Sequence, residues 1–246
     1  ELQIHLTAIK KSEPMHKSHA VYEFFRSFFL GNTAAVEQRL EMFCALPVDD
    51  AKDADELVDL MLGSDQYAQQ FDSLCELLES IQEYEYVVKV REAIIVEKIS
   101  AFGAESKEAG VALYNLGLAY GDLGDFIKQR DVLERALAIK ERAYGRDHPN
   151  VATTLGNLGI AYGQLGDYTK ARDMLERALA IKERTYGRDH VEVAQTLMNL
   201  GTAYGRLGDQ AKKRDVLERT LAIKERAYGR DHPEVAKTLG NLGNAY

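Results

Sequence analysis

Three histidines, each directly after an aspartate, are the residues of this chain that most suggest chemistry. The pairs stand 42 residues apart, at Asp147–His148, Asp189–His190 and Asp231–His232. Imidazole and carboxylate groups could hold a metal together, but metal ligands must converge within about 2 Å of one ion. Equivalent positions of a repeated chain are separated in space. We therefore predict no metal site and expect these residues to cap the helices that follow them.

A glycine-rich phrase is the second candidate. Residues 155–167 read LGNLGIAYGQLGD and could be mistaken for a phosphate-binding loop. Such a loop follows a strand and ends in Lys followed by Ser or Thr, whereas this phrase has neither feature. In addition, no Ser–His–Asp, paired-carboxylate or Cys–His set can be placed in one cleft from the sequence. We predict that the chain is not an enzyme and binds no cofactor.

The net charge of −8 over 246 residues is unevenly distributed. Residues 1–107 contain 10 Lys and Arg against 20 Asp and Glu, whereas residues 108–246 contain 21 against 19. Neither part has the basic excess that nucleic-acid binding requires. No apolar run approaches the roughly 20 residues that span a bilayer, and no secretory signal opens the chain. We expect a cytoplasmic protein with no nucleic-acid or membrane partner, and reduced core thiols at Cys44 and Cys75.

The elements that must position these residues follow from a repeat of 42 residues. The phrase around Asn157 recurs around Asn115, Asn199 and Asn241, which gives three full units and the first helix of a fourth. Apolar residues at three- and four-residue spacing predict two helices in the middle unit, over 151–165 and 168–186. We expect Gly166 and Gly187 to end them.

These units resemble tetratricopeptide repeats, and the resemblance covers residues 108–246. The 42-residue form, with LxNLGxAYxxLGDYxKA and GRDHPxVAxTL, is similar to the repeats of kinesin light chain and related adaptors. The resemblance implies an all-α fold, a right-handed superhelical α-solenoid of helix-turn-helix repeats. We expect residues 1–107 to form an acidic helical N-terminal cap, with a helical pair at 18–46. We also expect a degenerate repeat there, in which Phe71, Leu74 and Leu78 take the apolar positions of the first helix and residues 84–106 correspond to the second helix and its loop.

One face of each first helix is predicted to be buried. On a helical wheel at about 100° per residue, Leu158, Gly159 and Tyr162 fall within about 60° of Leu155. Small residues at Gly159, Ala171 and Ala178 would let paired helices approach closely. The other units have Gln129 and Lys213 in place of Ala171, so we expect them to pack less tightly or to turn these long side chains outward.

The opposite face varies between units and also contains the recurring Asn. In tetratricopeptide proteins this surface binds peptides, and the Asn commonly hydrogen-bonds the peptide backbone; an amide suits that role because it both donates and accepts. The residues expected to contact a peptide are Asn115, Asn157, Asn199, Asn241, Thr153, Gln195, Lys237, Leu118, Ile160, Thr202, Asn244, Gln164 and Arg206. The alternative is that the Asn is a remnant of duplication.

The function that this resemblance implies is protein–protein interaction. We expect an adaptor or scaffold that binds a peptide segment of a partner in the groove. The alternative is a structural or sensor arm of a larger signalling protein, whose repeats contact neighbouring domains or other copies of the chain.

Overall fold

The computed structural model describes residues 47, 51 and 53–243, and this part of the chain forms ten α-helices, one 3-10 helix and no strand. The predicted helical pair at 18–46, Cys44 and Asn244 lie outside the described residues. The chain divides into two compact units, residues 1–97 and 98–246. The role of residues 1–107 as a cap stays a prediction.

In the described part of the first unit, short helices surround an apolar core. The elements are α4 (Ala54–Leu62), a 3-10 helix (Asp65–Gln70), α5 (Phe71–Ser80) and α6 (Tyr84–Phe102), which runs past the end of this unit. Leu57, Leu74 and Leu78 are fully buried. Cys75 is a buried free thiol, and burial raises its pKa to about 12, so it stays protonated and unreactive near neutral pH.

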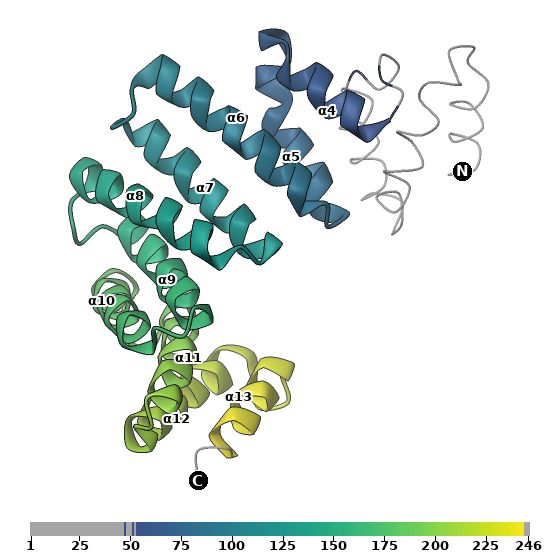
Figure 1. The fold of residues 1–246 in the computed structure, drawn as a ribbon. Helices are drawn as coiled ribbons and strands as arrows, with labels where there is room; N and C mark the ends of the chain where they lie inside the picture. The colour runs from purple at the N-terminus through teal and green to yellow at the C-terminus, as the bar shows by residue number, and fades with distance from the viewer. Residues whose placement is uncertain (1–46, 48–50, 52, 244–246) are drawn as a thin grey trace, which may run out of the picture. The chain divides into compact units, whose positions relative to one another are not determined.

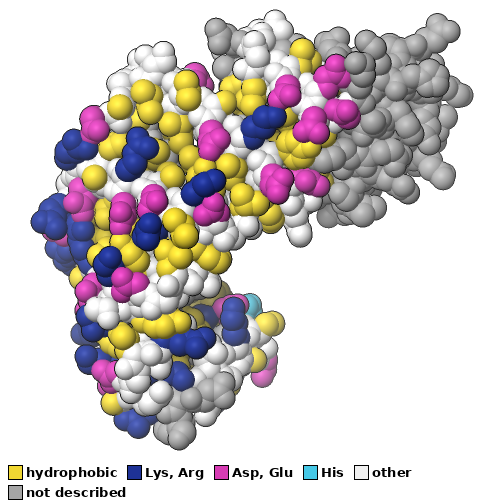
Figure 2. Space-filling view, in the orientation of Figure 1, with side chains coloured by type: hydrophobic (Ala, Val, Ile, Leu, Met, Phe, Trp, Pro, Cys, Tyr) yellow, Lys and Arg dark blue, Asp and Glu magenta, His cyan; other side chains and the backbone are white. Residues whose placement is uncertain are grey.

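The second unit is a stack of antiparallel helix pairs. Its helices are α7 (Lys107–Leu123), α8 (Phe126–Tyr144), α9 (Pro149–Gln164), α10 (Tyr168–Tyr186), α11 (Val191–Arg206), α12 (Gln210–Tyr228) and α13 (Pro233–Gly243). Each first helix, α7, α9 and α11, contacts its own partner helix, and each partner contacts the next first helix (Figure 1). Acidic and basic side chains are interspersed over these helices (Figure 2). No helix of the described residues is long and apolar enough to cross a bilayer.

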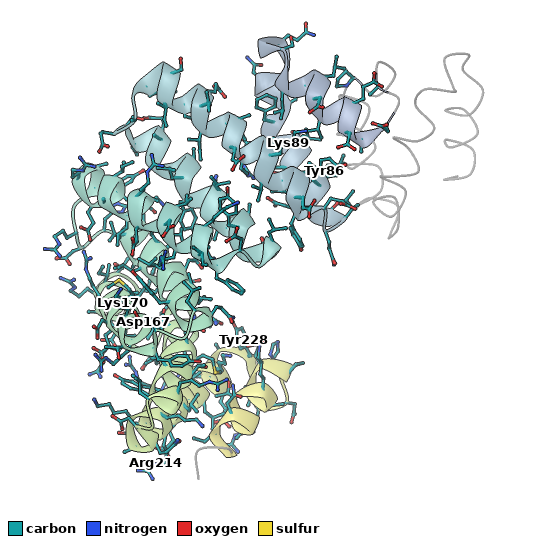
Figure 3. The ribbon with its side chains drawn as sticks, in the orientation of Figure 1. Tyr86, Lys89, Asp167, Lys170, Arg214 and Tyr228 are labelled. Atoms are coloured by element: carbon teal, nitrogen blue, oxygen red, sulfur yellow. The ribbon has the colours of Figure 1, made fainter. Side chains whose placement is uncertain are left out.

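Local sequence signals set the helix ends. Asp167 caps α10 by accepting a hydrogen bond from the backbone N–H of Lys170 at 3.1 Å (Figure 3). At the other end Gly187 adopts a φ of 90°, a conformation that glycine reaches without the steric cost of a side chain. The helices predicted over 151–165 and 168–186 are confirmed as α9 and α10.

The predicted buried face is also confirmed. Leu155, Leu158 and Tyr162 are at most 6% exposed. A Cβ atom on Gly159 would lie 2.6 Å from Leu175 Cγ and 3.2 Å from the carbonyl oxygen of Ala171, so only glycine allows this approach of α9 and α10. One apolar cluster runs from Leu133 on α8 to Tyr204 on α11, so neighbouring repeats share a core.

The long side chains that replace Ala171 do not behave alike. Gln129 is only 5% exposed, and its amide lies against Gly121, so the expectation that it turns outward was wrong. Glycine at position 121 leaves the space into which this side chain folds. Lys213 is half-buried and lays its alkyl chain along Gly205, where a Cβ atom on the glycine would lie 3.0 Å from Lys213 Cδ.

Candidate functional site

The three recurring histidines are helix caps. Nδ1 of His148 accepts a hydrogen bond from the backbone N–H of Asn150 at 3.1 Å, and His190 and His232 accept equivalent bonds at 3.2 Å. Each ring also stacks on the Tyr four residues earlier, with centroids 4.6–5.1 Å apart. The predicted capping role is confirmed. Among the described residues, no group of three or more His, Cys, Asp or Glu could hold a metal ion.

The aspartates beside these histidines connect successive repeats. Asp147 binds Arg184 at 2.8 Å, and Asp189 binds Arg226 at 2.7 Å. The hydrogen bond from Arg184 lowers the pKa of the Asp147 carboxyl. The sequence analysis missed this pairing, although the recurrence of Asp and Arg at one offset was a usable signal. Because both partners of each pair are well exposed, water and salt screen the attraction and the pairs contribute little to stability.

Two cavities of the second unit lie where one repeat meets the next. We call junction 1 the place where α7 and α8 meet α9, junction 2 the place where α9 and α10 meet α11, and junction 3 the place where α11 and α12 meet α13. Junction 2 contains a cavity of about 400 Å³, and junction 3 contains one of about 270 Å³. Both cavities adjoin the variable face of the first helices.

The structure brings part of the predicted set together at these cavities. The predicted residues that line the junction 2 cavity are Ile160, Gln164, Asn199, Thr202 and Arg206. Thr202, Arg206 and Asn241 line the junction 3 cavity. The predicted residues that line neither cavity are Asn115, Leu118, Thr153, Asn157, Gln195 and Lys237. Thr153 donates instead to the carbonyl of Pro149 at the start of its own helix.

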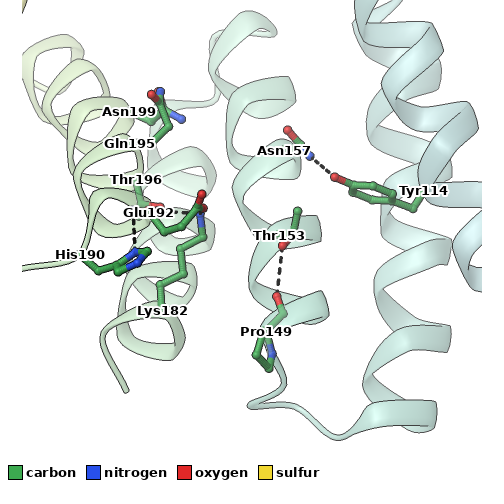
Figure 4. A network of polar contacts seen from close by, with 10 residues as sticks. All are labelled: Tyr114, Pro149, Thr153, Asn157, Lys182, His190, Glu192, Gln195, Thr196 and Asn199. Atoms are coloured by element: carbon green, nitrogen blue, oxygen red, sulfur yellow. Dashed lines mark hydrogen bonds and ion pairs between the residues drawn. The ribbon is translucent and has the colours of Figure 1, made fainter. Parts of the chain in front are cut away.

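The recurring Asn side chains have different partners. Asn157 donates across junction 1 to the hydroxyl of Tyr114 at 2.9 Å (Figure 4), and Asn241 lies 3.3 Å from the sulfur of Met198. Asn199 has only a long contact within its own helix, where its Oδ1 accepts from Gln195 at 3.4 Å. Its Nδ2 group has no hydrogen-bond partner within the part of the chain that the structure describes.

Second-helix residues of the cavities were not predicted. Tyr168 and Ala171 line junction 2, and Lys213 lines junction 3. The guanidinium of Arg206 lies 5.9 Å from the centroid of the Tyr168 ring, a geometry compatible with a cation–π contact. The sequence did show that the letter at position 171 changes between units, but that change was interpreted only as a packing difference.

Comparisons with known proteins agree with the repeat architecture. The tetratricopeptide repeat family model matches residues 108–184 and 162–225, whereas a search of curated proteins gives no match. Proteins with this repeat are interaction scaffolds that bind protein partners.

Two solved structures illustrate the shared fold. The nearly identical TPR-like repeats of a protein named "putative kinesin light chain" from Podosopora anserina superimpose with a TM-score of 0.63 at 22% identity, over 73% of this chain and 86% of that chain. BtubC (BKLC) from P. vanneervenii gives a TM-score of 0.62 at 23% identity, over 92% of this chain and 94% of that chain. The helix pairs, the 42-residue period and the family match together show that residues 108–225 consist of tetratricopeptide repeats, with a fold similar to that of the kinesin-light-chain-like structures.

Proposed function

We propose that the chain binds an extended segment of a partner protein across junctions 2 and 3. The observation that carries this proposal is the position of Asn199. Its amide lines the 400 Å³ cavity, and its Nδ2 group has no hydrogen-bond partner among the described residues. A peptide unit, which both donates and accepts, would satisfy this amide whatever the side chain of the ligand.

The lining of the two cavities also favours one kind of ligand charge. Arg206 lines both cavities, Lys213 lines the second, and the lining residues include no carboxylate. Ile160 and Tyr168 add apolar surface at junction 2. A segment that combines an apolar side chain with negative charge complements this surface better than a basic segment does.

A binding titration tests the proposal. Peptides selected from a library by panning against the purified chain are titrated calorimetrically into the wild type and into Asn199→Ala. Loss of one hydrogen bond is expected to weaken binding by about 2- to 12-fold. The matched control is Thr169→Ala, an exposed position on α10, which should bind as the wild type does.

The opposite result is as informative. Equal affinities for the wild type and Asn199→Ala would remove Asn199 from the binding site. If panning returns no binder and the chain instead self-associates in sedimentation experiments, the structural-arm alternative replaces the peptide-binding proposal.

A further inference from the structure

Three equivalent positions on the first helices face the recurring Asn of the next repeat. They are occupied by Tyr114, Gly156 and Met198, opposite Asn157, Asn199 and Asn241 respectively. The distance in sequence from Tyr114 to Asn157 equals that from Met198 to Asn241, and both pairs are in contact. The residue at this position therefore decides whether the Asn side chain already has a partner within the chain.

At junction 1 the side chain of Tyr114 is the partner of Asn157. The hydroxyl of Tyr114 accepts the hydrogen bond from Asn157 Nδ2, and its ring lies under the ammonium of Lys140, whose Nζ is 3.7 Å from the ring centroid. Burial raises the pKa of Tyr114, so the hydroxyl stays protonated. Figure 4 shows Tyr114 reaching from its own helix toward Asn157.

Gln129 is a second side chain that fills space at junction 1. Gln129 is buried against Gly121, at the position where junction 2 has Ala171. Its Oε1 has no hydrogen-bond partner in the described part of the chain. The Gln129 side chain packs at junction 1 although its oxygen has no partner among the described residues. It occupies space that the smaller Ala171 leaves open at junction 2.

Junction 2 has the small residue at both positions. Apart from its chain neighbours and the nearby backbone of its own helix, no atom lies within 4 Å of a Cβ placed on Gly156, and Ala171 lines the 400 Å³ cavity. At junction 3, where Met198 and Lys213 take these positions, the cavity is about 270 Å³. Space for a ligand therefore follows the size of these two side chains.

The position of Lys140 explains why the Tyr114 ring is held. Lys182 and Lys224, its equivalents, pair with Glu192 at 3.3 Å and Glu234 at 2.6 Å. The corresponding residue in the earlier repeat is Asn150, and no carboxylate pairs with Lys140 among the described residues. Only 4% exposed, Lys140 instead contacts the Tyr114 ring and donates to Thr154 Oγ1 at 3.1 Å. A buried ammonium requires such compensation.

From these contacts we propose that Tyr114 is a plug, held by Lys140 and Asn157, which closes junction 1 so that a partner segment is bound at junctions 2 and 3 only. This inference rests on the proposed peptide-binding function. It proposes that Tyr114 and Gln129 determine which junctions the partner segment occupies. It also proposes that Asn150, which has no carboxylate to pair with Lys140, leaves Lys140 available to hold the plug.

The charge at junction 1 acts in the same direction. Asp122 stands at the position that Gln164 and Arg206 occupy at the later junctions. Partial burial raises the pKa of Asp122, but the carboxyl group cannot attract a negatively charged segment as Arg206 can. Size and charge both direct an acidic ligand away from junction 1.

A labelling experiment without any ligand tests the plug. Leu118→Cys reports on junction 1, and Ile160→Cys, its equivalent one repeat later, reports on junction 2; a bulky maleimide is applied and each site is quantified by mass spectrometry. If junction 1 opens in fewer than about one in ten molecules, Leu118→Cys is labelled about tenfold more slowly than Ile160→Cys. Adding Tyr114→Gly with Gln129→Ala should bring the two rates together.

Two matched variants separate the plug from general loosening. Tyr114→Phe keeps the ring on Lys140 but loses the hydrogen bond from Asn157, so it should speed the labelling of Leu118→Cys much less than Tyr114→Gly does. Asn150→Glu should draw Lys140 to a carboxylate, as at Lys182, and speed the labelling of Leu118→Cys, whereas Glu192→Asn should not. Equal labelling of Leu118→Cys and Ile160→Cys in otherwise wild-type chains would overturn the inference.

Peptide binding gives a separate readout. With a selected peptide, Asn157→Ala should change affinity by less than about twofold in the wild type but by about 2- to 12-fold in the Tyr114→Gly, Gln129→Ala chain. A large effect of Asn157→Ala in the wild type would overturn the plug while leaving the proposed function intact. Absence of any peptide binding would overturn the proposed function, whereas the labelling result would still decide the plug.

Discussion

Lys140, Lys182 and Lys224 occupy one position of the repeat, yet only Lys140 lacks a carboxylate partner among the described residues. Burial lowers the pKa of Lys140 to about 8. The sequence showed the exchange of Glu for Asn at position 150, but it could not show the consequence. That consequence depends on a ring from α7 and a hydroxyl from α9 that lie far from Lys140 in the chain. Contacts between residues 14 or more positions apart form only when the helices pack together, so a sequence pattern alone does not show them.

Lys140 is expected to make stability depend on pH. Its pKa is about 8 in the folded chain and about 10.4 when unfolded, so between these values the unfolded chain binds more protons. The free energy of unfolding should therefore rise with pH in this window. Lys140→Met removes the buried charge and should raise the free energy of unfolding at pH 7 by about 1–3 kcal/mol. The loss of the contacts with Tyr114 and Thr154 reduces this gain. Urea unfolding of wild type and variant at pH 7 and 9.5 measures the effect.

The advantage of the variant should shrink at pH 9.5, where the wild-type amine has lost most of its proton. Lys182→Met is the control, because it removes a lysine that has a carboxylate partner and should be destabilising at both values. A stability difference between Lys140→Met and wild type that does not change with pH would contradict this account.

At the scale of elements, local signals were sufficient to predict most of the structure. Periodic apolar residues, capping Asp or His, and terminal Gly specify α9 and α10 within the sequence itself. The position of Gly159 at a helix crossing was also predicted, because every repeat has glycine at this position. The orientation of Gln129 was not, because it depends on the space left by Gly121 on a different helix.

Gly159→Leu is expected to disrupt the crossing of α9 and α10. Its Cβ alone would meet Leu175 Cγ at 2.6 Å and the backbone oxygen of Ala171 at 3.2 Å, and a backbone atom cannot move aside as a side-chain tip can. Overpacking should cost at least about 1–3 kcal/mol, measured as a lower thermal midpoint. Gly156→Leu is the matched control, since its Cβ meets no atom of a neighbouring helix within 4 Å. A Gly159→Leu midpoint equal to that of wild type would show that this face is wrongly assigned.

At the scale of the whole molecule, the repeat period predicted the stacked helix pairs, and the family match supports them. The shared core from Leu133 to Tyr204 shows why one repeat depends on the next. The sequence also led to the prediction that the variable face is the binding surface, and this stays a prediction. It did not distinguish the junctions, because the cavities at junctions 2 and 3 are lined by side chains from neighbouring helices. That difference decides where along the repeats a partner segment is expected to lie.

Photo-crosslinking of a bound peptide to the wild-type chain tests this account most directly. A selected peptide that carries a photoreactive group at each position in turn is irradiated in the complex, and the attachment sites are found by mass spectrometry. The account expects attachment to the residues around the two cavities, on α9, α11 and α13, with Ile160, Asn199 and Thr202 among the sites. Attachment confined to the outward faces of α8, α10 and α12, or to residues 1–97, would contradict it.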